Sequence, residues 1–410
     1  MTPPRPDFLG LSRRWVGVCA ALYLLLLIYG TLYPFHGWVV PRDGFLSQVL
    51  MLDSDRFSKT DLVTNVLVYL PFGVLLGGYW GQRTGWFAAL LLAGLMGTGL
   101  SFSLEAVQVF LPARTSALSD LALNALGTIS GALLAWVVAG KTLVGARLRH
   151  LRNDCFAPGA QANIGLMVLC LWILSQLSPL VPSLGISTLR HGLKPIWHTL
   201  TGQVPFIPAQ ALVYFCSIAA LGGIALSISR SRRKGLLLMA LVVVTVLLLK
   251  VPVLSRQLSL EALLGCAGGL LVLFFLNRTG ERPLLIASGV FLAVGFIVDT
   301  LRASPESTQL IAFNWIPFRG HMQNLVGLTN ILAGGWVFLG AGYVVRYLTG
   351  GGSVRVLVSG GMLVIGLAAL MEWLQRSIPG RSPDITDILI AVVAWGCAWL
   401  GGLAHDENGH

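Results

Sequence analysis

Two sets of polar residues in this sequence could do chemistry, and they occur in the same order and at the same spacings. One reads Glu105-x-x-Gln108, Pro112-x-Arg114 and Asp120, and the other reads Glu372-x-x-Gln375, Pro379-x-Arg381 and Asp387. Carboxylates can transfer protons, and a guanidinium can bind carboxylates or phosphates through paired hydrogen bonds. A charged side chain inside a membrane segment costs about 2.5–3.5 kcal/mol on insertion scales, so charges kept there mark candidate functional sites.

Helical spacing predicts that each set gathers at one end of a helix bundle. Positions three or four apart share a helix face, so Glu105 and Gln108 point the same way, as do Asp120 and Asn124. The hairpin 110–116 between these helices is too short to separate their ends by much. Including the residues that open the preceding helix on the same side, the candidate ligand-binding residues are Asp61, Asn65, Glu105, Gln108, Arg114, Asp120 and Asn124, with Glu372, Gln375, Arg381, Asp384 and Asp387 in the second set.

Two roles are open for these residues. We expect Arg114 and Arg381 to lie between the acids, because a planar guanidinium can bridge two carboxylates. The alternative is structural, with aspartates that cap the following helix and arginines that lock the hairpin. Glu105 and Glu372 sit one to two turns inside their helices, which favours a functional role for them.

The second set departs from the first at two places. Position 391 is alanine where the first set has Asn124, and the counterpart of Asn65 is either Asn324 or Asn330. We therefore do not expect the two sites to work identically.

The elements that carry these residues must be membrane-spanning helices. The chain of 410 residues is 55% hydrophobic and only 11% charged, which excludes an ordinary soluble globule. The sequence predicts an all-α polytopic membrane protein with about twelve transmembrane helices, each long enough to cross about 30 Å of hydrocarbon. The predicted spans are 15–33, 62–80, 86–109, 117–139, 163–181, 208–228, 235–254, 258–276, 284–300, 322–346, 355–376 and 385–403.

The spans group into three repeats of four, at 1–150, 155–280 and 281–410. Each group opens with a span that ends near a proline, followed by a long loop, a span, a short basic turn, a span, a hairpin and a last span. The middle group is degenerate: its hairpin keeps Arg256 and Glu261, but no glutamate faces them from the preceding span. Glycine pairs such as Gly127-x-x-x-Gly131 predict close helix packing.

Charge placement predicts the orientation of the chain. The formal net charge is +11, and lysine and arginine are densest in the turns on the side of the termini, which favours both termini in the cytoplasm. No aromatic and basic platform for nucleic acid accompanies this charge. The first span lacks a cleavage site and is read as retained, and the scattered cysteines resemble core residues more than disulfides or metal ligands.

Three stretches together resemble the VanZ-like family of bacterial membrane proteins. They run from Asp61 to Gly73, from Glu105 to Arg114 and from Asp120 to Gly127, with a second resemblance at Asn314 to Phe318 and at Glu372 to Asp387. The resemblance implies two VanZ-like units that flank a degenerate third. It also implies the bacterial cytoplasmic (inner) membrane and a link to glycopeptide (teicoplanin-type) resistance.

Three classes of function remain open. The first is a protein without enzymatic activity that binds a membrane lipid head group, a lipid-linked wall precursor or a glycopeptide in an outward-facing polar pocket. The second is a membrane-embedded enzyme that acts on a lipid-linked substrate, with Glu105 as general acid or base and Arg114 as phosphate clamp. The third is a twelve-span secondary transporter, for which polar groups are expected near the membrane midplane. No cofactor and no metal are expected, because no histidine pair or other metal-ligand set lies near the site.

Overall fold

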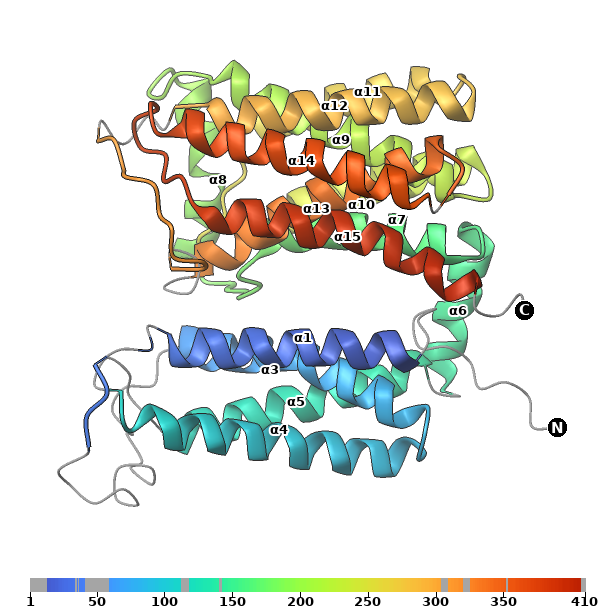
Figure 1. The fold of residues 1–410 in the computed structure, drawn as a ribbon. Coiled ribbons are helices and arrows are strands. Elements are labelled where there is room, and N and C mark those ends of the chain that lie inside the picture. Colours follow the sequence, from blue (N-terminus) through green and yellow to red (C-terminus); the bar gives the residue numbers. More distant parts are fainter. Residues whose placement is uncertain are drawn as a thin grey trace. The chain divides into compact units, whose positions relative to one another are not determined.

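The computed structural model is all-helical over the residues it describes. These residues are 13–33, 35, 37–40, 59–111, 118–139, 142–303, 309–319, 325–351 and 353–406. The chain divides into two compact units, residues 1–152 and 153–410 (Figure 1). Fourteen α-helices occur in the described ranges.

The first unit is a bundle of four long helices. They are α1 (Arg13–Leu32), α3 (Lys59–Gly81), α4 (Trp86–Gln108) and α5 (Leu118–Ala139), and the unit boundary falls inside α6 (Leu143–Cys155). Helix α3 packs most closely on α5, and α4 packs on both. The core of this bundle includes Leu27, Tyr69, Phe72 and Ala93.

The second unit holds nine helices in its described residues. They are α7 (Ala160–Leu177), α8 (Ile186–Leu200), α9 (Pro208–Ile228), α10 (Arg232–Leu249), α11 (Leu260–Leu276), α12 (Glu281–Leu301), α13 (Leu325–Leu348), α14 (Val354–Gln375) and α15 (Ile385–Asp406). Helix α9 lies at the centre, with Ile218 and Ile224 fully buried, and it packs on α11 and α12. Helix α13 packs on α7 and α15.

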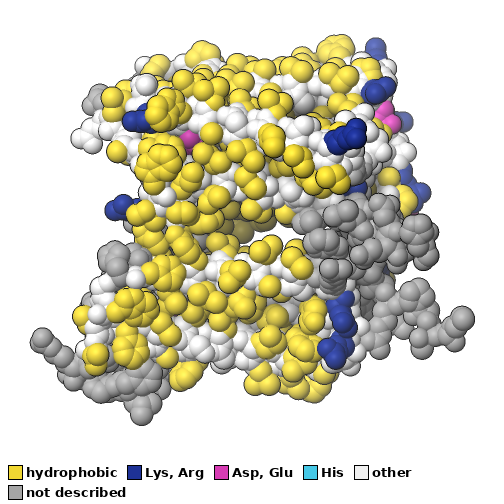
Figure 2. Space-filling model, in the orientation of Figure 1, with side chains coloured by type: hydrophobic (Ala, Val, Ile, Leu, Met, Phe, Trp, Pro, Cys, Tyr) yellow, Lys and Arg dark blue, Asp and Glu magenta, His cyan; other side chains and the backbone are white. Residues whose placement is uncertain are grey.

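The helices match the predicted spans in position. Seven of them are long and apolar enough to cross a membrane, and three more apolar helices are shorter, over the residues that the structure describes. Of the two remaining predicted spans, α10 opens with Arg232, Arg233 and Lys234, and α3 opens with Lys59. Figure 2 shows hydrophobic side chains over much of the visible face of each unit, with charged side chains mainly toward the helix ends. The protein is therefore a polytopic membrane protein, as predicted.

The glycine pairs do allow close helix packing. A Cβ atom added at Gly73 or Gly131 would collide with the main chain of the facing helix, at Thr128 and Leu70 respectively. A Cβ atom at Gly265 would meet the carbonyl of Ala211 in the same way. Helices α3 and α5, and likewise α9 and α11, thus touch backbone to backbone, which confirms the packing prediction.

Candidate functional site

The second predicted set converges at the hairpin between α14 and α15. Glu372 and Gln375 share one face at the end of α14, and the Gln375 amide Nε2 donates to Glu372 Oε1 at 3.2 Å. Glu372 Oε2 accepts a hydrogen bond from the main-chain N–H of Asp384 at 2.8 Å. Only 3% of Glu372 is exposed. Glu372 of α14 thereby hydrogen-bonds the residue just before α15.

Asp384 caps helix α15. It precedes the first helical residue, and its Oδ1 accepts from the main-chain N–H of Thr386 at 2.8 Å, which satisfies one of the free donors at the helix start. Its Oδ2 accepts from the Asn314 side-chain amide at 2.7 Å. Asp384 therefore has the structural role that was left open for the aspartates.

The segment 309–319 is fastened to this hairpin by main-chain hydrogen bonds. Asn314 N donates to the Pro383 carbonyl at 2.8 Å, and Ile385 N donates to the Asn314 carbonyl at 3.0 Å. Next to Asn314, the rings of Phe313 and Trp315 lie with their centroids 4.4 Å apart. An aromatic pair is thus held beside the carboxylates.

Arg381 hydrogen-bonds main-chain carbonyls at the end of α12. Its Nε donates to the carbonyl of Arg302 at 2.8 Å, and its Nη2 donates to the carbonyl of Asp299. The last carbonyls of a helix lack partners within the helix, so the guanidinium caps the end of α12. Burial lowers the pKa of Arg381. Two of its donors are thus used on main-chain carbonyls instead of bridging carboxylates.

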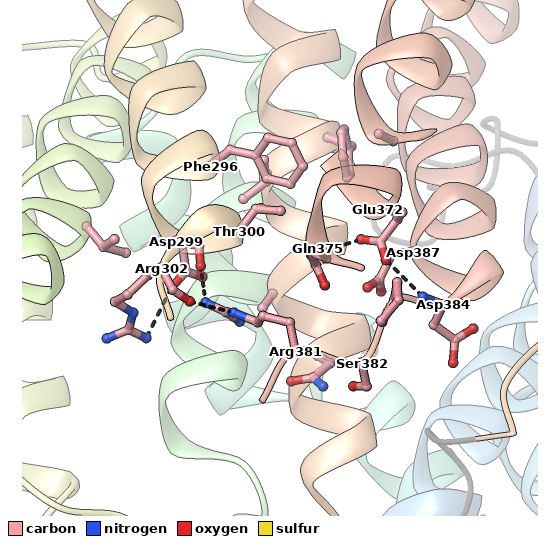
Figure 3. Close-up of a pocket in the computed structure, with 18 of the residues that line it drawn as sticks. Phe296, Asp299, Thr300, Arg302, Glu372, Gln375, Arg381, Ser382, Asp384 and Asp387 are labelled. Carbon is pink, nitrogen blue, oxygen red and sulfur yellow. Dashed lines mark hydrogen bonds and ion pairs between the residues drawn. The ribbon is translucent and has the colours of Figure 1, made fainter. Parts of the chain in front are cut away.

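A cavity of about 980 Å³ lies in the second unit, with this cluster in its wall. Its polar lining includes Glu372, Gln375, Arg381, Asp384 and Asp387, all from the predicted set. Figure 3 shows Glu372 and Asp387 next to each other, and Asp299 with Arg302 on the other side of Arg381. The side chains of Asp299 and Arg302 form an ion pair at 3.4 Å.

The rest of the cavity wall is largely apolar and aromatic. It includes Trp172 of α7, Phe291 and Phe296 of α12, and Trp336 of α13. Carboxyl groups and cations therefore lie in the same cavity as rings and aliphatic side chains. Such a cavity can take a molecule that is polar at one end and apolar at the other.

The first predicted set is also partly brought together. Asn65 Nδ2 donates to Asp120 Oδ1 at 2.6 Å, joining α3 to α5. Gln108 Nε2 donates to the Thr31 carbonyl of α1 at 3.0 Å. Glu105 is 6% exposed, so its carboxyl group is buried inside the bundle.

Asn124 joins α5 to α4. Its Nδ2 donates to Ser101 Oγ at 2.9 Å, and its buried Oδ1 has no hydrogen-bond partner among the residues that the structure describes. Arg114 and the side chain of Asp61 lie outside the described residues, as does Asn324. Of the two proposed counterparts of Asn65, Asn330 lines the cavity of the second unit.

Several residues at the site were not among the predicted candidates. Asp299, Arg302 and Trp315 line the cavity, and a charge at the end of an apolar span was the signal for the first two. Lys250 is 4% exposed and donates to the Tyr214 hydroxyl at 3.0 Å. Lys250 follows the last residue of α10 and does not line the cavity. It lies six residues before Arg256, as Gln375 lies six residues before Arg381.

Metal ligands do not gather in the part of the chain that the structure describes. Within these ranges no three His, Cys, Asp or Glu side chains are grouped so that they could hold an ion. The arrangement offers instead two adjacent carboxyl groups, which can exchange a proton, and cationic side chains that can bind an anion.

These features define a polytopic membrane protein with a polar cluster at one end of its helices. Residues 20–139 match the family described as VanZ/LLP1 and carry a domain of that family. The match covers the first predicted group alone, so the second VanZ-like unit and the degenerate middle one stay predictions. No curated protein and no solved structure matches the chain.

Proposed function

We propose that the second unit binds the head group of an amphiphile in its cavity. The observation that carries this proposal is that Glu372, Asp387 and Arg302 line one cavity of about 980 Å³ together with aliphatic and aromatic side chains. Ligand cavities of about 300–1,000 Å³ with a few placed polar groups are typical of small-molecule sites. The ligand classes that fit are a membrane lipid, a lipid-linked wall precursor and a lipophilic glycopeptide.

The cellular setting is part of the same proposal. The VanZ/LLP1 domain at residues 20–139 and its link to glycopeptides support a role in the bacterial cell envelope, including teicoplanin-type resistance. We place the protein in the cytoplasmic (inner) membrane with both termini in the cytoplasm, because the basic turn Arg230–Lys234 follows the positive-inside tendency. The cavity then faces outward, because it lies at the ends of α7, α12 and α14 that are away from this turn.

Mass spectrometry of the intact protein in mild detergent tests the proposal. We expect a copurified amphiphile that is lost when Glu372→Gln and Asp387→Asn are combined, since these changes remove the acidic groups and keep the side-chain shapes. Glu281→Gln is the matched control, because Glu281 is exposed at the opposite end of α12. An unchanged complement of bound amphiphile in the double variant would contradict the proposal.

The adjacent carboxyl groups favour one second candidate, an enzyme that acts on a lipid-linked substrate. Glu372 and Asp387 could pass a proton between them while Arg302 binds a phosphate. Turnover of lipid-linked phosphates by the purified protein, abolished by Glu372→Gln alone, would favour this candidate. Binding without turnover would favour the first.

A further inference from the structure

Helix α8 lies between the predicted spans 163–181 and 208–228, where the sequence predicted a long loop. It connects α7 to α9 and packs on the second unit through one side only. The Leu258 N–H donates to the Gly192 carbonyl at 2.8 Å, and a Cβ atom at Gly192 would meet the main chain of Val251. This side of the helix is therefore fixed against the hairpin of the middle group.

A neighbouring side of α8 is an exposed apolar stripe. Ile186, Leu193, Trp197 and Leu200 are 81%, 48%, 65% and 64% exposed. Their spacings of seven, four and three residues put them on one helix face. An exposed apolar stripe on an amphipathic helix is typical of a surface that contacts the membrane.

Basic side chains follow one edge of this stripe. Arg190 and Lys194 are four residues apart, so they share a face, and both are exposed. No aspartate or glutamate occurs anywhere in 182–207. Long cationic side chains can rest their stems on apolar surface and hold their charges at the level of phosphate groups.

The place of α8 in the fold agrees with this chemistry. It follows the C-terminal end of α7 and precedes the N-terminal end of α9, so it lies at one end of the spans, and Figure 1 shows it there, across their direction. A helix that joins two span ends on the same side of a membrane lies at the membrane surface. The charge, the apolar stripe and this location all fit one partner, the interfacial layer of the bilayer.

We propose that α8 lies in the membrane interface and binds the phosphate head groups of anionic lipids through Arg190 and Lys194, with its apolar stripe in the acyl chains. This lipid contact is separate from the cavity, because none of these stripe or basic residues lines it. It would fix the depth of the second unit in the leaflet next to the cavity's polar cluster.

Spin labels on the full-length protein in lipid nanodiscs test the burial. In a cysteine-free background we would place single labels at Leu193→Cys and Trp197→Cys, with Gln203→Cys, an exposed polar position after the helix, as control. We expect the first two labels to collide more with oxygen than with a water-soluble nickel chelate, and the control label to show the reverse. Labels at 193 and 197 that favour the nickel chelate would overturn the proposal.

Thermal unfolding in nanodiscs of two compositions tests the head-group contact. We expect the wild-type protein to be more stable with phosphatidylglycerol added to phosphatidylcholine. The combined variant Arg190→Gln and Lys194→Gln should lose that gain, whereas the charge-preserving swap Arg190→Lys and Lys194→Arg should keep it. A neutral variant that keeps the full gain would also overturn the proposal.

Discussion

At the scale of single residues, the hairpin arginine makes the same two main-chain hydrogen bonds in the middle group as in the third. Arg256 Nε donates to the Ser178 carbonyl and its Nη2 donates to the Ser175 carbonyl at 3.1 Å. Arg381 contacts the carbonyls of Asp299 and Arg302 at the same spacing of three residues. Each guanidinium therefore closes the first helix of its group from the hairpin between the third and fourth.

This capping role predicts a stability effect that lysine cannot rescue. Arg256→Ala and Arg381→Ala should each lower the free energy of unfolding by about 2–3 kcal/mol, because hydrogen bonds from a charged group are lost and carbonyls are left unpaired. The lysine variants Arg256→Lys and Arg381→Lys should still lose more than half of that free energy, since an ammonium group cannot donate to two carbonyls in the geometry of a guanidinium. Thermal unfolding in detergent measures both, with Arg355→Ala, at an exposed arginine, as control. Full rescue by lysine would show that charge alone matters.

The difference between Asn124 and Ala391 predicts unequal effects of exchanging them. Asn124→Ala removes one hydrogen bond to Ser101 together with a buried oxygen that has no hydrogen-bond partner among the described residues, so we expect a loss of about 1 kcal/mol or less. Ala391→Asn inserts an amide where the side chain is 0% exposed, and should cost about 1–3 kcal/mol before any steric strain. Both variants can be compared by thermal unfolding. Equal losses would contradict this account of the third group.

Part of the site could be predicted from the sequence, and the rest could not, for physical reasons. Helical spacing and a short hairpin sufficed to bring Glu372, Gln375 and Asp387 to one place. The acceptors of Arg381 could not be predicted, because main-chain carbonyls leave no signature in a sequence. The contact of Asn314 with Asp384 joins a loop to a hairpin 70 residues away, and only the fold reveals such a pair.

At the scale of elements, the second helix of each predicted group packs against the fourth. The pairs are α3 with α5, α9 with α11 and α13 with α15. Small residues make these approaches possible, including Gly342, where a Cβ atom would meet the side chain of Ala398. Close packing of this kind stabilises helix association in a membrane, because the hydrophobic effect does not drive helices together in lipid.

A valine at Gly131 should therefore disrupt the first unit. Its Cβ would fall on the Leu70 carbonyl of α3, so the helices must move apart at a cost of about 1–3 kcal/mol or more. Gly99→Val is the matched control, because nothing lies within 4 Å of an added Cβ there. Thermal unfolding in detergent, or the yield of folded protein, should fall for Gly131→Val and stay near wild type for the control. Similar losses in both variants would argue against a backbone contact.

Helix boundaries were within reach of the sequence, but α8 was not recognised. Long apolar runs in a sequence indicate membrane spans, and the ends of the predicted spans coincide with helix ends to within a few residues. Helix α8 has apolar residues at 186, 189, 193, 196, 197 and 200, separated by polar ones. That pattern is typical of an amphipathic surface helix, but it is too short and too polar to be found by a search for long apolar runs.

At the scale of the whole molecule, one type of main-chain contact occurs in all three predicted groups, at different positions relative to the hairpin arginine and with donor and acceptor sides reversed in the middle group. In each, the segment after the first helix hydrogen-bonds the hairpin between the third and fourth. Val39 N donates to the Phe110 carbonyl in the first group, Leu254 N to the Val181 carbonyl in the second and Asn314 N to the Pro383 carbonyl in the third. The middle group has a contact of this type and the hairpin arginine Arg256, but no glutamate in α10, and the three-group repeat stays a prediction.

Twelve spans with both termini on the cytoplasmic side predict which loops can be labelled from outside. Single cysteines at Gln203 and Ser382, both exposed, should react with a membrane-impermeant maleimide in intact cells, because they lie at the ends of the spans assigned to the outer face. Cysteines at Thr84 and Thr279, also exposed, should react only after the membrane is opened. A permeant maleimide is the control and should label all four. Labelling of Thr84→Cys from outside would contradict the predicted orientation. If only one of Gln203→Cys and Ser382→Cys were labelled from outside, α9 and α15 would enter the membrane from different sides, which would contradict the grouping by four.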